Sequence, residues 1–307
     1  MKIFKKIVLA FLVTLILVLI GTYFHFDQKF TPEKNYLTVK NESGKVPMIW
    51  LGNDKNVLLV PIHFPTDSTT YYLQFDTGSP STVLYTQAIK NIKAIQISHD
   101  HAKASFTLGK TGISSNRFKL INQGKNDHKY TLPIIGTLGA DILENNRTLI
   151  NFKSSYLVFN LTKAPSQYTD QLMDFKFKKR KIILKGILKG KEKQFLFDSG
   201  TSAYELLTQK EEWTNLKSPH SGVVTEQAQS WQNILTTYTA TCDQNIEFQN
   251  KKIPLRHVTY VEGFSQMQYA LMKFSGMTGM LGNKIFLNNV LYLDCKNEKI
   301  AIDCLKI

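Results

Sequence analysis

The chain has 307 residues, of which 43% are hydrophobic and 11% aromatic, and it carries a formal net charge of +14. This length suits one large domain or two of ordinary size, and the apolar content excludes an intrinsically disordered chain. The positive charge favours anionic membrane surfaces, acidic substrates or nucleic acid as partners.

The N-terminus predicts a membrane anchor. An uncharged apolar run, residues 7–24, follows Lys2, Lys5 and Lys6. As a helix it would span about 27 Å, enough for the hydrocarbon core of a bilayer. The lysines favour a cytoplasmic tail over residues 1–6, with everything after the run on the periplasmic or extracellular side. A cleaved signal peptide is the alternative, but no small-x-small cleavage site follows the run, so we favour an uncleaved single-pass signal anchor.

After the run, residues 25–45 are expected to form a juxtamembrane stalk. Next, "VLLVPIHF" and "YYLQFD" flank the turn-forming "PTDST", and such β-branched and aromatic runs are typical of a β-hairpin. The second strand of this hairpin leads into "FDTGS" at residues 75–79. One Asp-Thr-Gly after a strand is usually an ordinary turn.

The same pattern occurs again in the second half of the chain. "KIILKGIL" and "KQFLFD" flank "KGKE", and the second strand leads into "FDSGT" at residues 197–201. Downstream, "GTLGADILENN" begins at Gly136 and "GMLGNKIFLNN" begins at Gly279, and the two align without a gap. Each is followed by a hairpin-like unit. Two blocks that repeat in the same order indicate two copies of one unit.

We therefore predict an all-β protein with two homologous β-barrel-like lobes related by a pseudo-twofold axis. The N-terminal lobe is expected over residues 46–163 and the C-terminal lobe over residues 175–307, with a linker at residues 164–174. Helical periodicity is scarce between the repeated blocks and amounts to single turns such as "ADILENN". Because both lobes belong to one chain, we expect a monomer.

Positive charge is densest over residues 176–193, which contain nine Lys or Arg. Apolar residues interrupt this segment in a strand-like way, so we interpret it as a hairpin with a solvated basic face. No nucleic-acid-binding motif accompanies the charge, and we expect no nucleic-acid partner.

The cysteines and histidines give little support to disulfide or metal chemistry. Cys242, Cys295 and Cys304 form an odd set, which excludes a full disulfide framework and leaves one bridge open. Their spacing does not resemble a zinc site. His99 and His101 would share one face of a strand, but they lack a third ligand. We expect no metal and no cofactor.

The repeat suggests a use for the two aspartates. Copies of one unit commonly pack about a twofold axis, and such packing would bring Asp76 and Asp198 together. Two carboxylates in close contact cannot both ionise cheaply, so they share one proton. The charged one could act as a base toward water while the protonated one donates to a carbonyl oxygen. Gly78 and Gly200 would let each loop turn sharply and present N–H groups to the carboxylates.

Hydroxyl residues flank both aspartates. Thr77 and Ser199 are expected to reach across the axis and to lock the two loops together. Ser79 and Thr201 are expected to hydrogen-bond the outer carboxylate oxygens and so to lower the pKa of the pair.

These residues resemble those of the pepsin-like aspartic proteases, a bilobal all-β family, and the compact lobes also resemble the single-lobe retroviral-type enzymes. The resemblance rests on "FDTGS", "FDSGT", "TLG" at residues 137–139 and "MLG" at residues 280–282, and it covers nearly everything after residue 46. It implies an endopeptidase that cleaves peptide or unfolded protein substrates through a water held between the two aspartates, without metal or covalent intermediate. It also implies an acidic pH optimum. In the family the second motif braces each active-site loop, here through Leu138, Gly139, Leu281 and Gly282.

The chain departs from the family pattern at the flap. No Trp follows the first Asp-Thr-Gly, and the first lobe has no Tyr-Gly flap signature. By position, the flap is expected as a hairpin around residues 97–106, opposite residues 225–231 in the second lobe. The flap residues of the family therefore have no counterparts here that would indicate a substrate preference.

Two non-enzymatic hypotheses stand beside the protease. One is a catalytically silent pepsin-fold module that binds or inhibits peptides in the cell envelope. The other is a membrane-anchored adhesin that uses the basic hairpin. Both aspartates and all four hydroxyl neighbours are present, which favours the enzyme because binding alone does not need a pair of carboxylates. Neither "GxSxG" nor a Gly-Lys-Ser/Thr loop occurs, so serine hydrolase and phosphate-loop chemistry are excluded.

Overall fold

A computed structural model describes residues 2–122, 132–230, 233–249, 251–263 and 276–303. The chain divides into two units, Met1–Lys34 and Asn35–Ile307. The first unit contains helix α1 (Lys2–Lys29), which begins before the predicted span and ends after it. Its segment Ile3–Thr22 has a mean hydropathy of 2.7, so the helix is long and apolar enough to cross a membrane.

The second unit begins within the segment expected as a stalk. Strand β1 (Thr38–Lys40) pairs with β9 (Thr111–Ile121), and the buried Ser43 accepts a hydrogen bond from the backbone N–H of Phe159 through its Oγ. Residues 38–43 therefore belong to the β structure and not to a stalk. The segment is polar overall, so a sequence pattern alone did not distinguish it from a linker.

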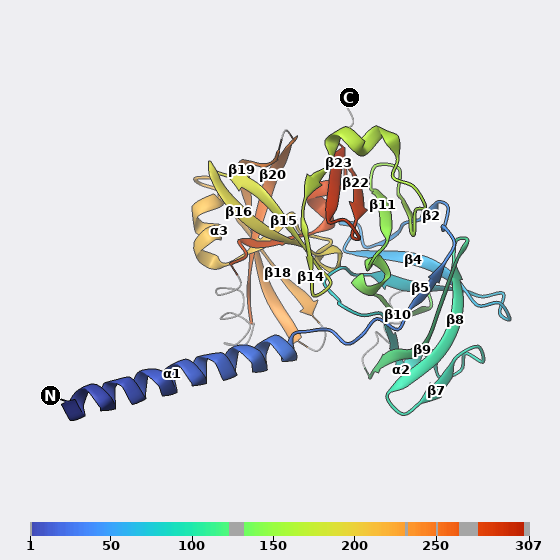
Figure 1. Cartoon of the computed structure of the whole chain (residues 1–307). Helices are drawn as coiled ribbons and strands as arrows, with labels where there is room; N and C mark the ends of the chain where they lie inside the picture. The colour runs from blue at the N-terminus through green and yellow to red at the C-terminus, as the bar shows by residue number, and fades with distance from the viewer. Residues whose placement is uncertain (1, 123–131, 231–232, 250, 264–275, 304–307) are drawn as a thin grey trace. The chain divides into compact units, whose positions relative to one another are not determined.

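Six strands of the first repeat close into a barrel (Figure 1). Around the barrel the order is β4, β5, β10, β6, β9, β8 and back to β4. The β5–β10 and β6–β9 pairs are parallel, and the other pairs are antiparallel. The bounds of these strands and their neighbours are β3 (Ile49–Leu51), β4 (Val57–His63), β5 (Thr70–Phe75), β6 (Val83–Tyr85), α2 (Thr86–Ile89), β7 (Gln96–Ser98), β8 (His101–Leu108) and β10 (Ile134–Leu138).

The second repeat forms a ring-like sheet with the same plan. Its order is β15, β16, β21, β17, β20, β19 and back to β15, and again the second and fourth pairs are parallel. Each strand therefore has a counterpart in the first repeat. The bounds are β14 (Lys176–Lys178), β15 (Lys181–Leu188), β16 (Lys191–Phe197), β17 (Leu206–Thr208), α3 (Lys210–Leu216), β18 (Val223–Ser230), β19 (Asn233–Phe248), β20 (Lys251–Glu262) and β21 (Gly279–Leu281).

A third, six-stranded sheet takes strands from both repeats in the order β13, β23, β22, β11, β12, β2. At its centre β11 pairs antiparallel with β22, with Leu149 opposite Tyr292. On one side of this contact β11, β12 and β2 come from the first repeat; on the other, β22 and β23 come from the second repeat and β13 from the segment predicted as the linker. The sheet therefore joins the two halves. The bounds are β2 (Val46–Pro47), β11 (Arg147–Asn151), β12 (Tyr156–Val158), β13 (Met173–Asp174), β22 (Val290–Asp294) and β23 (Lys299–Asp303), with η2 (Ser166–Gln171) before β13.

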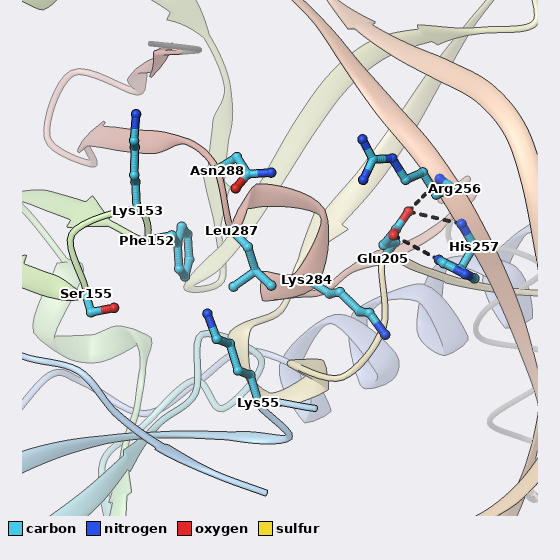
Figure 2. Close-up of a pocket in the computed structure, with 10 residues that line it drawn as sticks. All are labelled: Lys55, Phe152, Lys153, Ser155, Glu205, Arg256, His257, Lys284, Leu287 and Asn288. Carbon is cyan, nitrogen blue, oxygen red and sulfur yellow. Dashed lines mark hydrogen bonds and ion pairs between the residues drawn. The ribbon is translucent and has the colours of Figure 1, made fainter. Parts of the chain in front are cut away.

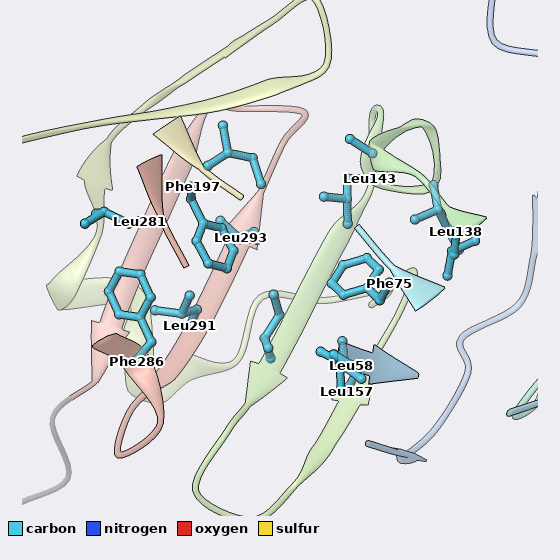
Figure 3. Close-up of a cluster of buried hydrophobic side chains, with 14 of the residues drawn as sticks. Leu58, Phe75, Leu138, Leu143, Leu157, Phe197, Leu281, Phe286, Leu291 and Leu293 are labelled. Atoms are coloured by element: carbon cyan, nitrogen blue, oxygen red, sulfur yellow. The ribbon is translucent and has the colours of Figure 1, made fainter. Parts of the chain in front are cut away.

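The core anchors the strand end that precedes each Asp-hydroxyl-Gly motif. Phe75 and Phe197 are fully buried and make edge-to-face contacts with Phe159 and Phe286, each with ring centroids 5.5 Å apart. Figure 3 shows each of these two phenylalanines surrounded by leucine side chains. Such aromatic pairs combine large apolar burial with a defined ring geometry, so both strand ends are held firmly.

The basic segment is not a uniformly solvated face, in contrast to the prediction. Arg180, in the turn between β14 and β15, is only 4% exposed. Its guanidinium donates to Glu144 Oε2 at 3.1 Å, to the carbonyl oxygen of Pro80 at 3.2 Å and to Ser81 Oγ at 3.3 Å. Arg180 thus links the second repeat to the loop that follows Asp76.

A short helix and two cysteines are further features of the second repeat. Helix α3 was not predicted; Trp213 anchors it, because the indole N–H donates to the carbonyl oxygen of Val258 at 3.1 Å. A helix of two turns leaves too little periodicity in the sequence to be recognised. Cys242 and Cys295 are free and buried, and Cys304 lies outside the described residues.

Candidate active site

Asp76 and Asp198 lie immediately after β5 and β16, at the strand ends that the repeats place in equivalent positions. The backbone N–H of Asp76 donates to the carbonyl oxygen of Leu138 at 3.0 Å, and that of Asp198 donates to Leu281 at 2.9 Å. Leu138 and Leu281 end the parallel strands β10 and β21 and are fully buried. The second sequence block of each repeat therefore fixes the backbone of the aspartate in the first.

Each loop turns back on its own carboxylate. The N–H groups of Gly78 and Ser79 donate to Asp76 Oδ1 at 2.8 and 3.1 Å. In the second loop the N–H of Gly200 donates to Asp198 Oδ1 at 2.8 Å. Because backbone donors stabilise the ionised form of a carboxyl group, the loop around Asp76 is the better suited to a negative charge.

The two loops hold each other through reciprocal hydrogen bonds. The N–H of Thr77 donates to Ser199 Oγ, and the N–H of Ser199 donates to Thr77 Oγ1, both at 2.9 Å. Each hydroxyl in turn donates to a carbonyl oxygen of the other repeat: Thr77 to Phe197 at 3.1 Å, and Ser199 to Phe75 at 3.0 Å. Both side chains are buried, so these bonds satisfy groups that water does not reach.

The carboxylates themselves are in contact across this junction. A methyl group placed on Gly78 would lie 2.5 Å from both carboxylate oxygens of Asp198. A methyl group on Gly200 would lie 2.5 Å from Asp76 Oδ1. The side chain of each aspartate thus occupies the space left by the glycine of the opposite loop. The structure brings Asp76 and Asp198 together in this way.

The hydroxyls of Ser79 and Thr201 do not perform the role expected of them. Ser79 Oγ donates to the carbonyl oxygen of Ser81, and Thr201 Oγ1 donates to the backbone carbonyl oxygen of Asp198, both at 2.9 Å. The expected hydrogen bonds to the carboxylate oxygens are therefore absent from these two side chains. In these tight turns backbone N–H groups bond the carboxylate oxygens instead, and Ser79 contributes through its own N–H.

Gly139 and Gly282 bring the second block close to each loop. A methyl group on Gly139 would collide with the backbone of Ser81, and one on Gly282 would collide with the carbonyl oxygens of Thr201 and Tyr204. Any larger residue would therefore push the block away from the loop that it supports.

A buried pair behind the first loop was not predicted. The N–H and the hydroxyl of Thr82 both donate to the carboxylate of Asp141 at 2.7 Å, and Thr82 Oγ1 accepts from the N–H of Gly139. Burial raises the pKa of Asp141 to about 6. In the second repeat Asn283 Nδ2 donates to the carbonyl oxygen of Ser199 at 3.1 Å. The one signal in the sequence is a carboxylate inside the apolar "GADIL".

Burial raises the pKa of both Asp76 and Asp198, which we call the dyad. For Asp198 the negative charge of Asp76 raises it further. For Asp76 the N–H of Gly78 acts in the opposite direction. The pair can therefore hold one proton, and Asp198 is the better place for it.

This raised pKa makes the stability of the protein depend on pH. A carboxyl group whose folded pKa exceeds its unfolded value of about 4 stabilises the fold below that pH, and the contribution is lost as the pH rises toward the folded pKa. We expect Asp198→Asn to exceed the wild type in free energy of unfolding at neutral pH by at least about 1 kcal/mol, since one pKa unit corresponds to about 1.4 kcal/mol. Urea unfolding at a series of pH values checks this. A constant difference between the two proteins down to about pH 4 would contradict it.

The segment expected as the flap and the segment expected opposite it both form hairpins. Strands β7 and β8 pair antiparallel, with Gln96 opposite Lys103 at one end and Ser98 opposite His101 at the turn. Strands β18 and β19 pair antiparallel as well, with Val223 opposite Ala240 and Ser230 opposite Asn233. The second hairpin is the longer of the two. Trp231, which was expected in this segment, lies outside the described residues.

Of the two histidines in the first hairpin, His101 has side-chain partners. His101 Nδ1 lies 2.6 Å from Asp100 Oδ1, and its Nε2 lies 3.3 Å from Arg117. His99 adopts a left-handed backbone conformation in the turn. Within the described parts of the chain, no group of three or more His, Cys, Asp or Glu side chains could hold a metal ion.

A scan against protein-family models and a search of the curated proteins found no match to this chain. The repeat and the geometry of the two loops are therefore the evidence for a function.

Proposed function

We propose that the chain is an aspartic endopeptidase of the pepsin-like, bilobal class. The observation that carries this proposal is the contact of Asp76 with Asp198 at the junction of two loops that hydrogen-bond each other reciprocally. The matching strand order of the two rings supports a pseudo-twofold relation between two lobes. A structural turn alone has no need for two partly buried carboxyl groups in contact, because withdrawing them from water is costly.

The chemistry follows from the unequal surroundings of the two aspartates. Ionised Asp76 takes a proton from a water molecule held between the carboxyl groups while the water oxygen attacks the peptide carbonyl carbon. Asp198 gives its proton to the carbonyl oxygen, and a tetrahedral gem-diol forms. The C–N bond then breaks as Asp76 gives its proton to the leaving nitrogen and Asp198 recovers one from a hydroxyl group. The side chains are restored, and no covalent enzyme intermediate forms.

The proposal also includes a membrane anchor, a flap and a monomeric state. Helix α1 would anchor the enzyme as a single-pass membrane protein, and the lysines before it favour a catalytic part outside the cytoplasm. The hairpin β7–β8 would act as the flap over the substrate, opposite the hairpin β18–β19. A monomer would suffice, since one chain supplies both aspartates.

Cleavage of peptides tests the proposal. The full chain in detergent micelles is incubated with a diverse peptide mixture from about pH 3 to about pH 8, a range that covers the ionisation of carboxyl pairs, and the products are identified by mass spectrometry. We expect cleavage where Asp76 is ionised and Asp198 is protonated, a decline as the pH rises through the pKa of Asp198, and inhibition by a statine-type transition-state mimic. Lack of cleavage, or cleavage that the mimic does not affect, would favour a catalytically silent binding module.

A further inference from the structure

In each repeat, the segment that follows the Gly-x-x-Ile block meets a turn of the other repeat. We call each of these two contact regions a corner, and the two corners differ in charge. In the first corner, the turn between β14 and β15 supplies Arg180, which forms a salt bridge with Glu144 at 3.1 Å. Glu144 follows the 3-10 helix η1 (Ala140–Leu143). The gap-free alignment of the repeats places Leu287 at the position of Glu144. The second corner therefore lacks the carboxylate that neutralises the cation in the first.

The second corner still has cations. The turn between β3 and β4, which corresponds to the turn that carries Arg180, carries Lys55. A pocket of about 450 Å³ opens here, and Figure 2 shows that its walls come from both repeats. Its lining includes four cationic side chains together with Leu287 and Asn288: Lys55, Lys153, Arg256 and Lys284.

The one carboxylate among the described lining residues is already engaged. Glu205 is buried and accepts hydrogen bonds from the backbone N–H groups of Arg256 and His257 at 2.6 and 3.1 Å. Its other oxygen lies 3.1 Å from His257 Nδ1. The salt bridges within the described part of the chain include none of the four cationic side chains. The Nζ atom of Lys55 lies 5.5 Å from the ring centroid of Trp50, a cation–π contact that does not neutralise its charge.

A concave site lined by several unpaired cations attracts an anion, because the anion replaces the missing countercharge. More than one lysine or arginine favours a multiply charged group over a single carboxylate. Ser155 and Asn288 add polar side chains to the same lining. We propose that this pocket binds a phosphate group, which is either free inorganic phosphate or part of a lipid headgroup.

Calorimetric titration of the full chain in detergent micelles with inorganic phosphate tests the site. We expect saturable one-to-one binding. Lys55→Met and Leu287→Glu should each weaken it at least about tenfold, the first by loss of a charged partner and the second by supplying the carboxylate of the other corner. Lys191→Met, which changes an exposed lysine of β16, serves as the matched control and should bind as the wild type does.

Lack of saturable binding, or equal affinity in Lys55→Met, Leu287→Glu and the wild type, would overturn the proposal. A second arm compares short-chain phosphatidic acid with short-chain phosphatidylcholine. Tighter binding of phosphatidic acid than of inorganic phosphate, with the same dependence on Lys55, identifies a lipid headgroup; the reverse order identifies free phosphate. Asp198→Asn should leave phosphate affinity unchanged, so this test fails or succeeds separately from the proposed protease activity.

Discussion

Alanine at Gly78 is expected to abolish cleavage by the proposed active site. The new methyl group would lie 2.5 Å from both carboxylate oxygens of Asp198, well inside van der Waals contact. Asp198 cannot easily withdraw, because its Oδ1 accepts from the N–H of Gly200 and its backbone N–H is bonded to Leu281. The loops must therefore separate, and the two carboxyl groups can no longer share a proton. We expect kcat/KM to fall at least about 100-fold, the usual consequence of an ångström-scale displacement at a reacting centre.

The matched control for this change is Gly112→Ala. Gly112 lies in β9, has no side-chain or backbone atom within 4 Å of an added methyl group, and should keep wild-type kcat/KM. Gly200→Ala should fail in the same way as Gly78→Ala, because its methyl group would meet Asp76. Wild-type cleavage by either dyad-loop variant would show that the two carboxyl groups do not act together.

Valine at Thr77 is expected to destabilise the fold strongly although it preserves the shape of the side chain. It removes the hydroxyl that accepts from the N–H of Ser199 and donates to the carbonyl oxygen of Phe197. Both backbone groups would remain buried without a partner, and each costs about 1–3 kcal/mol. We therefore expect the free energy of unfolding to fall by roughly 2–6 kcal/mol in urea titration.

Thr214→Val provides the comparison for Thr77→Val. Thr214 lies on the exposed side of α3, where water can replace its hydrogen bond to Lys210, so the change should stay within about 0.5 kcal/mol. Ser199→Ala completes a double-mutant cycle with Thr77→Val, and the two costs should not add because both belong to one network. Equal unfolding midpoints for Thr77→Val and the wild type would contradict the role of this junction.

The duplication explains why so much of the site was predictable. Either Asp-hydroxyl-Gly alone is an ordinary turn signal, but the pairing of Asp76 with Asp198 follows once the repeat is seen. The same alignment identified Leu138 and Leu281, whose carbonyl oxygens bind the aspartate N–H groups. The prediction of a mostly β chain with an apolar N-terminal helix is confirmed, because strand alternation and apolar length are local properties of the sequence.

Other features depend on distances that no sequence pattern encodes. Ser79 and Thr201 lie beside the aspartates in sequence, yet their hydroxyls bond backbone carbonyl oxygens because the turn directs N–H groups to the carboxylate. Arg180 belongs to a strongly basic segment, and only the contact between repeats turns it into a buried link to Glu144. Local sequence indicates which groups are polar, while the tertiary contact decides which of them become buried.

In the proposed enzyme Asp76 and Asp198 together catalyse peptide hydrolysis. The cleavage rate of an unfolded protein substrate tests this most directly, measured for the full-length wild type, Asp76→Asn and Asp198→Asn, with Asp243→Asn, which changes an exposed aspartate of β19, as the control. We predict cleavage by the wild type and Asp243→Asn, and loss of at least about 1000-fold in both dyad variants, in line with removal of a general acid or base from the reaction. Cleavage by either dyad variant at the wild-type rate would contradict the claim.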